Sequence, residues 1–123
     1  RDWQKLFIVR ILDGSCANRH GVIVNLMDHD GFFEVAMIEL DGNVMLQTHR
    51  IPPASLRLAE IKHSASVKVV KCNVHGDNHV VGITGYVQYV DDKDLVISWQ
   101  DSYYETHELT FTKKHCAVVY ELE

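Results

Sequence analysis

Residues 85–100 read GYVQYVDDKDLVISWQ, and this pattern guides the interpretation of the whole chain. Apolar, β-branched and aromatic residues dominate 85–90 and 95–100, and the polar residues 91–94 separate these two runs. Such alternation of short runs and turn residues is typical of β-hairpins. The remaining predicted strands are 6–11, 21–26, 33–40, 44–49, 56–58, 67–71, 107–111 and 118–120. The sequence therefore predicts an all-β protein.

The order of strands and turns occurs twice. Three pairs of corresponding residues share an offset of 60 positions: Phe7 and Val67, Val35 and Leu95, and Asp41 and Asp101. Gly21 and Gly85 lie 64 positions apart, which indicates a longer first loop in the second copy. We therefore predict a structural duplication, with one domain at 1–62 and another at 63–123. The order of strands in each copy resembles that of SH3-like barrels, and this resemblance implies a single helical turn before the last strand, at 53–55 and 113–115.

Size and charge narrow the class of protein. Each copy is marginal in size for independent folding, so we expect the two copies to pack together. The chain begins at Arg1 and not at Met, so we expect a piece of a longer protein. No apolar run approaches the ~20 residues of a membrane span. The formal net charge of −5 favours a basic peptide partner, and the three cysteines favour a reduced, intracellular protein.

Two short motifs resemble known families. His20-Gly21-Val22-Ile23-Val24 is similar to the glycine-centred core of a KOW motif. In the second copy, Trp99, Asp101, Ser102 and Tyr103 follow the spacing of aromatic, acidic, small and aromatic residues that Tudor domains place after their third strand. The resemblance implies two tandem SH3-like, Tudor- or KOW-like five-stranded barrels. It further implies a tandem Tudor-like module of a larger nuclear chromatin protein, without enzymatic activity.

The Tudor resemblance implies a partial aromatic cage in the second copy for methylated lysine or arginine, as carried by histone tails. Trp99 and Tyr103 would form walls, Asp101 would supply the acid, and Tyr104 and Tyr86 are further candidates. A methylammonium keeps its charge and loses hydration, so aromatic rings attract it through cation–π and apolar contact. Trp99 shares strand parity with two apolar residues, so packing in the core or between the barrels stays an alternative. The corresponding turn 39–43 of the first copy contains no ring.

Catalysis and metal binding have weaker support in the sequence. Ser15, Cys16, His20 and Asp13 are close together, but no nucleophile motif surrounds them, so we expect no enzyme and no cofactor. Cys72, His75 and His79 have a spacing that zinc sites use, and His115-Cys116 could complete a set. Paired ligands at both ends are usual for structural zinc, and only one end has them. We therefore predict no metal site.

A KOW-type adaptor that contacts RNA, DNA or a protein of the transcription or RNA-processing machinery is the alternative function. Two groups of basic residues would carry it: Lys5, Arg10, Arg19 and His20 in the first copy, and Lys62, Lys68, Lys71, Lys113 and Lys114 in the second. Nucleic acid therefore stays open as a second partner, whereas a membrane is not expected. Under either function we expect a monomeric module.

Overall fold

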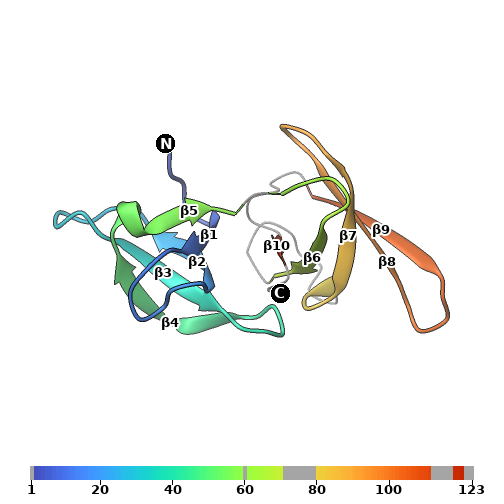
Figure 1. Cartoon of the computed structure of the whole chain (residues 1–123), viewed down its shortest axis with the longest axis horizontal. Coiled ribbons are helices and arrows are strands. Elements are labelled where there is room, and N and C mark those ends of the chain that lie inside the picture. Colours follow the sequence, from blue (N-terminus) through green and yellow to red (C-terminus); the bar gives the residue numbers. More distant parts are fainter. Residues whose placement is uncertain (1, 60, 71–79, 112–117, 121–123) are drawn as a thin grey trace.

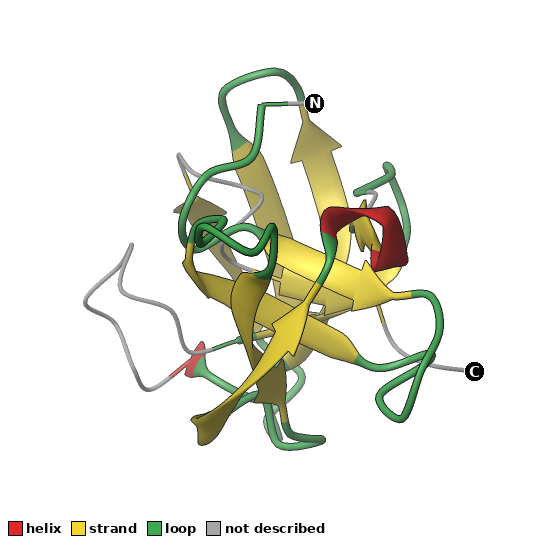
Figure 2. Ribbon diagram, turned by 90° about the vertical axis from the view of Figure 1, so that its left-hand side faces the viewer, coloured by secondary structure: helices red, strands yellow, loops and turns green. Residues whose placement is uncertain are grey.

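The computed structural model describes residues 2–59, 61–70, 80–111 and 118–120, which form two antiparallel five-stranded sheets (Figure 1). The first sheet has the order β4-β3-β2-β1-β5, with β1 at Ile8–Ile11, β2 at His20–Asn25, β3 at Phe33–Ile38, β4 at Val44–Ile51 and β5 at Leu56–Leu58. The second has the order β10-β6-β7-β8-β9, with β6 at Ser66–Val69, β7 at Thr84–Val90, β8 at Leu95–Gln100, β9 at Thr106–Phe111 and β10 at Val118–Tyr120. The all-β prediction is confirmed, and Figure 2 shows how far strands dominate.

Among the described residues, helical structure is limited to short turns. The predicted turn before β5 is confirmed as the 3-10 turn η1, Pro53–Ser55, whereas its expected counterpart at 113–115 lies outside the described residues. No helix in the described ranges is long and apolar enough to cross a membrane. The first sheet ends at Leu58 and the second begins at Ser66, on either side of the predicted boundary at 62/63.

The two sheets share details of strand register. Val9 pairs with Gly21 in the first sheet, and Val67 pairs with Gly85 in the second. A Cβ atom added to Gly21 would lie 2.5 Å from the side chain of Val35. A Cβ atom added to Gly85 would lie 2.6 Å from the carbonyl oxygen of Ser98. Both glycines therefore permit a close approach of the neighbouring strand. Just beyond these glycines, strands β2 and β7 each have an irregularity in their pairing, at 23–25 and at 87–89.

This register corrects part of the sequence alignment. Val9, and not Phe7, is the counterpart of Val67. Val35 pairs with Ile23, two residues after Gly21, and Ile97 pairs with Val87, two residues after Gly85. The counterpart of Val35 is therefore Ile97 and not Leu95. A shift by two residues keeps every side chain on the same face of a strand, so the apolar pattern alone cannot detect it.

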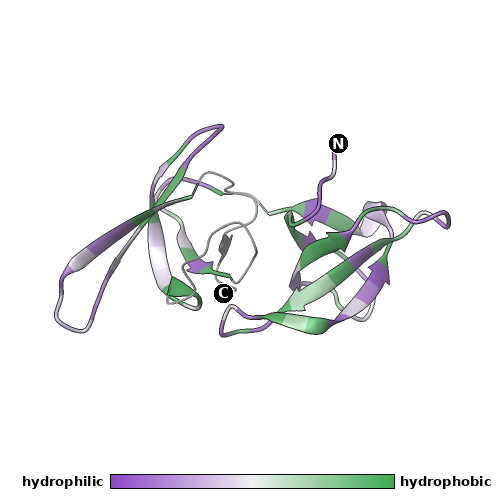
Figure 3. Ribbon diagram, turned by 180° about the vertical axis from the view of Figure 1, so that it is seen from behind, coloured by the Kyte–Doolittle hydropathy of each residue, from purple (hydrophilic) through white to green (hydrophobic). Residues whose placement is uncertain are grey.

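Each sheet covers its own apolar core. The first core consists of Val9, Ile11, Cys16, Ile23, Phe33, Val35, Met37, Ile51 and Leu56. The second consists of Val67, Val69, Val80, Val87, Leu95, Ile97 and Phe111. Figure 3 shows the molecule from behind: green predominates along the strands of the first sheet, whereas the outer part of the β8–β9 hairpin is largely purple and white. At about 25 cal/mol per Å² of apolar surface, burial of this kind is the main stabilising contribution in small β-domains.

A third cluster joins the two halves of the chain. Ile8, Val22 and Ala59 of the first half pack with Val70, which follows β6. The turn between β3 and β4 is also held against the second half. There, Gly42 is buried, and an added Cβ would lie 2.5 Å from the carbonyl oxygen of Val69.

Candidate recognition site on the β8–β9 hairpin

Strands β8 and β9 form a long hairpin that projects away from the rest of the molecule (Figure 1). The two strands pair without interruption from Leu95 and Phe111 to Gln100 and Thr106. Leu95 and Ile97 are fully buried at the base, and Trp99 is only partly buried nearer the tip, packed against the second core. One face of the hairpin therefore passes from core to solvent, with Trp99 at the transition.

The carboxylate of Asp101 organises the turn at the tip. Its Oδ1 accepts hydrogen bonds from the backbone N–H groups of Tyr103 (2.8 Å) and Glu105 (3.0 Å). The Asp101 N–H donates to the Glu105 carbonyl at 3.0 Å, which closes the turn. Tyr104 has a positive φ of 63°, a conformation that costs a non-glycine residue energy and that these hydrogen bonds support.

Asp101 also links the turn to Trp99 through His107. The Nε2 atom of His107 lies 2.7 Å from Asp101 Oδ2, and the imidazole stacks on the Trp99 ring at 5.6 Å between centroids and 21° between planes. The hydrogen bond with His107 is the largest cause of the lowered pKa of Asp101, followed among the lowering effects by the bonds from Glu105 and Tyr103. Asp101 is therefore held in its charged form at neutral pH. His107 did not enter the predicted site, although pairing the two strands about the turn would have placed it opposite Trp99.

The predicted site residues are only partly brought together. Tyr103 and Tyr104 are each 83% exposed at the tip, close in sequence to Asp101. Tyr86 pairs with Ser98, next to Trp99, so it leaves the sheet from the opposite face and does not join the Trp99 cluster. Trp99, Asp101, Tyr103 and Tyr104 thus belong to one hairpin, whereas Tyr86 lies on another surface.

The hairpin and the preceding turn carry a strongly acidic surface. Residues 85–111 contain one basic side chain besides His107, Lys93, and the carboxylates of Asp91, Asp92, Asp94, Asp101, Glu105 and Glu108. Asp91 is partly engaged, because it accepts a hydrogen bond from the Tyr89 hydroxyl at 2.6 Å and caps its own turn. Asp91, Asp92 and Asp94 lie at the base end of β8, whereas Asp101 and Glu105 lie at the tip, so these last two carboxylates make the local field at the tip attractive to cations.

Three potential metal ligands meet on this hairpin. Asp101, Glu105 and His107 each offer one ligand atom within 4.8 Å of the others. The Asp101 oxygens already accept hydrogen bonds from its own turn and lie against His107, so ion binding would have to compete with the turn itself. The zinc-type spacing of Cys72, His75, His79 and His115-Cys116 lies outside the described residues, as do Lys71, Lys113 and Lys114.

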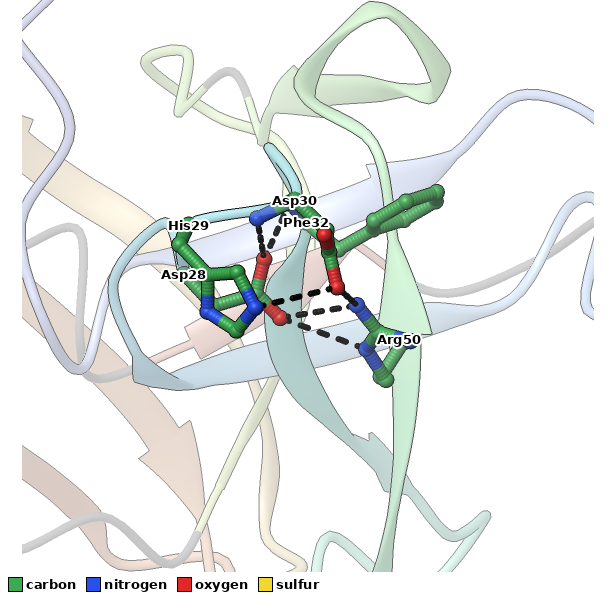
Figure 4. A network of polar contacts seen from close by, with 5 residues as sticks. All are labelled: Asp28, His29, Asp30, Phe32 and Arg50. Carbon is green, nitrogen blue, oxygen red and sulfur yellow. Dashed lines mark hydrogen bonds and ion pairs between the residues drawn. The ribbon is translucent and has the colours of Figure 1, made fainter.

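The first sheet holds an acidic and aromatic cluster whose cation is internal. In the loop between β2 and β3, Asp28 accepts hydrogen bonds from Arg50 at 2.9 and 3.2 Å (Figure 4). Asp30 accepts a further one at 3.3 Å, and the guanidinium lies 4.7 Å from the centre of the Phe32 ring. Acid and ring here are satisfied by the chain's own arginine. Among the described residues, the group in the corresponding place beside Asp101 and Trp99 at the tip of the second sheet is the imidazole of His107.

Comparison with known proteins does not extend this description: no protein-family model matches the chain, and no curated protein sequence is significantly similar to it.

Proposed function

We propose that the chain is a non-enzymatic recognition module of a nuclear chromatin protein, built from two tandem SH3-like barrels of Tudor or KOW type. In this proposal the tip of the β8–β9 hairpin binds a basic peptide tail, such as a histone tail, that carries a methylated lysine or arginine. The single observation that carries the proposal is the stack of Trp99, His107 and Asp101 beside two exposed tyrosines.

Strand order supports the barrel part of the proposal. In each sheet the last strand along the chain pairs with the first, β5 with β1 and β10 with β6, as a small five-stranded barrel requires in addition to contact between its edge strands. The short 3-10 turn before β5 is also common at this place in SH3-like barrels. The shared irregularity in β2 and β7 supports a common origin for the curvature of both sheets.

The chemistry of the tip supports a cationic ligand. His107 provides an aromatic, cationisable group that contacts the Trp99 ring and the Asp101 carboxylate simultaneously. A methylated ammonium offers the same two interactions, together with a permanent charge and apolar methyl groups. We infer that the ligand displaces His107 from Trp99 and pairs with Asp101, while Tyr103 or Tyr104 closes over the methyl groups.

Peptide titration calorimetry tests this proposal. We expect a trimethyl-lysine or dimethyl-arginine peptide to bind with micromolar affinity, because a short peptide at one hairpin buries little area. The unmethylated peptide should bind much more weakly. Trp99→Ala should remove binding, whereas Tyr86→Ala, on the opposite face, should leave the affinity unchanged.

Trp99 also packs against the core, so its replacement can weaken folding as well as binding. The double variant Tyr103→Ala/Tyr104→Ala avoids this problem, because both rings are exposed, and it should lower affinity with an unchanged unfolding midpoint. Equal binding of methylated and unmethylated peptides would contradict the proposal. A steep loss of affinity for RNA with rising salt, in the absence of peptide binding, would favour the KOW-type adaptor instead.

A further inference from the structure

A row of basic side chains crosses the first sheet on the face opposite its core. Arg10 on β1 pairs with Arg57 on β5 and with His20 on β2. Directly paired residues project to the same face of a sheet, so these three side chains lie side by side. We call them the arginine row. It lies far in sequence from the β8–β9 hairpin and does not depend on the function proposed for that hairpin.

Among the residues that the structure describes, no carboxylate pairs with the two arginines of the row. Two like charges on directly paired residues destabilise a sheet unless something neutralises them. Within the described ranges neither arginine forms an ion pair with a carboxylate, and Arg10 instead donates from Nη2 to the Asn18 side-chain oxygen at 3.3 Å. The chain has 17 acidic residues, so two paired arginines without an ion pair among the described residues are unexpected.

His20 forms the buried end of the row, and its imidazole has no hydrogen-bond partner in the described part of the chain. Its side chain is only 8% exposed, and none of the residues that the structure describes forms a hydrogen bond with its imidazole. Buried polar groups are nearly always hydrogen-bonded, so an unpaired buried imidazole indicates a missing partner. Burial, followed by the charge of Arg10, lowers the pKa of His20, which therefore presents a neutral ring with one N–H donor.

The row is short and bounded on one side. Ala59, Ile8 and Val22 occupy the neighbouring positions on the same face, and they pack against Val70 of the second half. The basic surface therefore ends where the contact between the two halves begins. Two guanidinium groups and one imidazole can converge on a single anionic group, but they do not continue as a track.

We propose that the arginine row binds a phosphate monoester, presented as phosphoserine or phosphothreonine on a peptide partner. Two guanidinium groups match the charge of a phosphate dianion and can each bind two of its oxygens. The imidazole N–H of His20 supplies a third donor at the buried end. The site would thus read a modification on a peptide.

A nucleic-acid backbone fits the row less well. Phosphodiester chains are held by basic tracks that neutralise several phosphates along a line. The arginine row offers one such position and is bounded on one side by apolar residues. A single phosphate on a peptide matches a site of this size.

Nuclear magnetic resonance titration of the whole chain tests this proposal. The probes are a short neutral peptide with one phosphoserine, its unphosphorylated form, inorganic phosphate, and a single-stranded RNA oligonucleotide. We expect the imidazole signals of His20 to shift in a saturable way with the phosphopeptide and with inorganic phosphate, and not with the unphosphorylated peptide. Arg57→Met and Arg10→Met, which keep apolar stems, should each weaken phosphopeptide binding about tenfold or more.

Arg19→Met is the matched control. The N–H of Ile11 donates to the Arg19 carbonyl at 2.9 Å, so Arg19 lies opposite Ile11, whose side chain belongs to the first core. The Arg19 guanidinium accordingly contacts Met45, which packs against that core. This variant removes the same charge from the other face and should bind the phosphopeptide normally. Equal weakening by all three substitutions would reduce the effect to net charge and overturn the proposal. Tight RNA binding without a response to the phosphopeptide would also overturn it.

Discussion

The turn between β3 and β4 and the turn between β8 and β9 begin alike and end differently. In both, an aspartate accepts a hydrogen bond from the backbone N–H two residues on, at 2.9 Å for Asp41 and 2.8 Å for Asp101. After Asp41 comes Gly42, which is small enough to sit against Val69 and Gly82 of the second half. After Asp101 comes Ser102, followed by two exposed tyrosines. The same capping chemistry thus supports an internal contact in one half and a free, aromatic tip in the other.

This comparison separates the role of the capping residue from the role of its neighbours. The aspartate fixes the shape of the turn in both halves, and the following residues determine whether the turn meets protein or solvent. The Lys68 ammonium also donates to the Leu40 carbonyl beside the first turn, which adds a polar contact to the internal docking. The second tip has the acid, the aromatic rings and the open surface that a ligand needs.

The largest effect is expected from Gly42→Ala. Gly42 has a φ of 87°, and a Cβ atom would lie 2.5 Å from the Val69 carbonyl oxygen and 3.0 Å from the Gly82 nitrogen. Strain and steric overlap together should lower the free energy of unfolding by about 2–4 kcal/mol. Ser102→Ala, at the exposed tip of the other turn, should change it by less than about 0.5 kcal/mol. Urea unfolding measures both, and equal losses would contradict the docked role of the first turn.

A second prediction concerns pH and contrasts His20 with Thr84, its counterpart opposite Lys68. Burial lowers the pKa of His20 in the folded chain below the ordinary 6.5, so the unfolded chain binds more protons as pH falls. Stability that is present above about pH 6.5 should therefore be lost progressively below it. In His20→Thr this part of the pH dependence should disappear. Urea unfolding at a series of pH values between 7.5 and 5 tests it, and an unchanged slope would argue against a buried neutral imidazole.

Asp101→Asn should reduce stability under neutral conditions and make unfolding less sensitive to acid. The pKa of Asp101 is lowered from 3.8, chiefly by His107, so its contribution is present above this value and is lost as pH falls through the lower folded pKa. Asp41→Asn should act in the same direction, because Asn43 lowers the pKa of Asp41. Acid unfolding followed by circular dichroism compares the two. A variant more sensitive to acid than the parent chain would contradict the capping role.

The smallest effect is expected from His107→Ala on ligand affinity. If His107 occupies the place of the ligand cation against Trp99, its removal frees the ring and should tighten binding of a methylated peptide about two- to fivefold, the equivalent of ~0.5–1 kcal/mol. Calorimetry at constant pH measures this change. Weaker binding in the variant would mean that His107 forms part of the site and does not compete for it.

Sequence patterns predicted much of the fold because strand periodicity and turn chemistry are local. The all-β class and the η1 turn followed from apolar runs and from Pro53, and Gly21 and Gly85 were matched correctly. The two-residue shift at Val9 escaped because it preserves side-chain parity. Tyr86 was grouped with Trp99 although strand pairing separates them, and His107 was missed because cross-strand partners depend on turn length. The burial of His20 depends on long-range packing, which no local pattern reveals.

The most direct test of the central claim is the position of the Trp99 indole signal during titration with a trimethyl-lysine peptide. We predict saturable shifts of the Trp99 indole N–H and of the His107 imidazole, with the Tyr86 ring signals unmoved. A peptide that shifts Tyr86 while leaving Trp99 and His107 unchanged, or an unmethylated peptide that reproduces all the shifts, would contradict the assignment of recognition to the free tip.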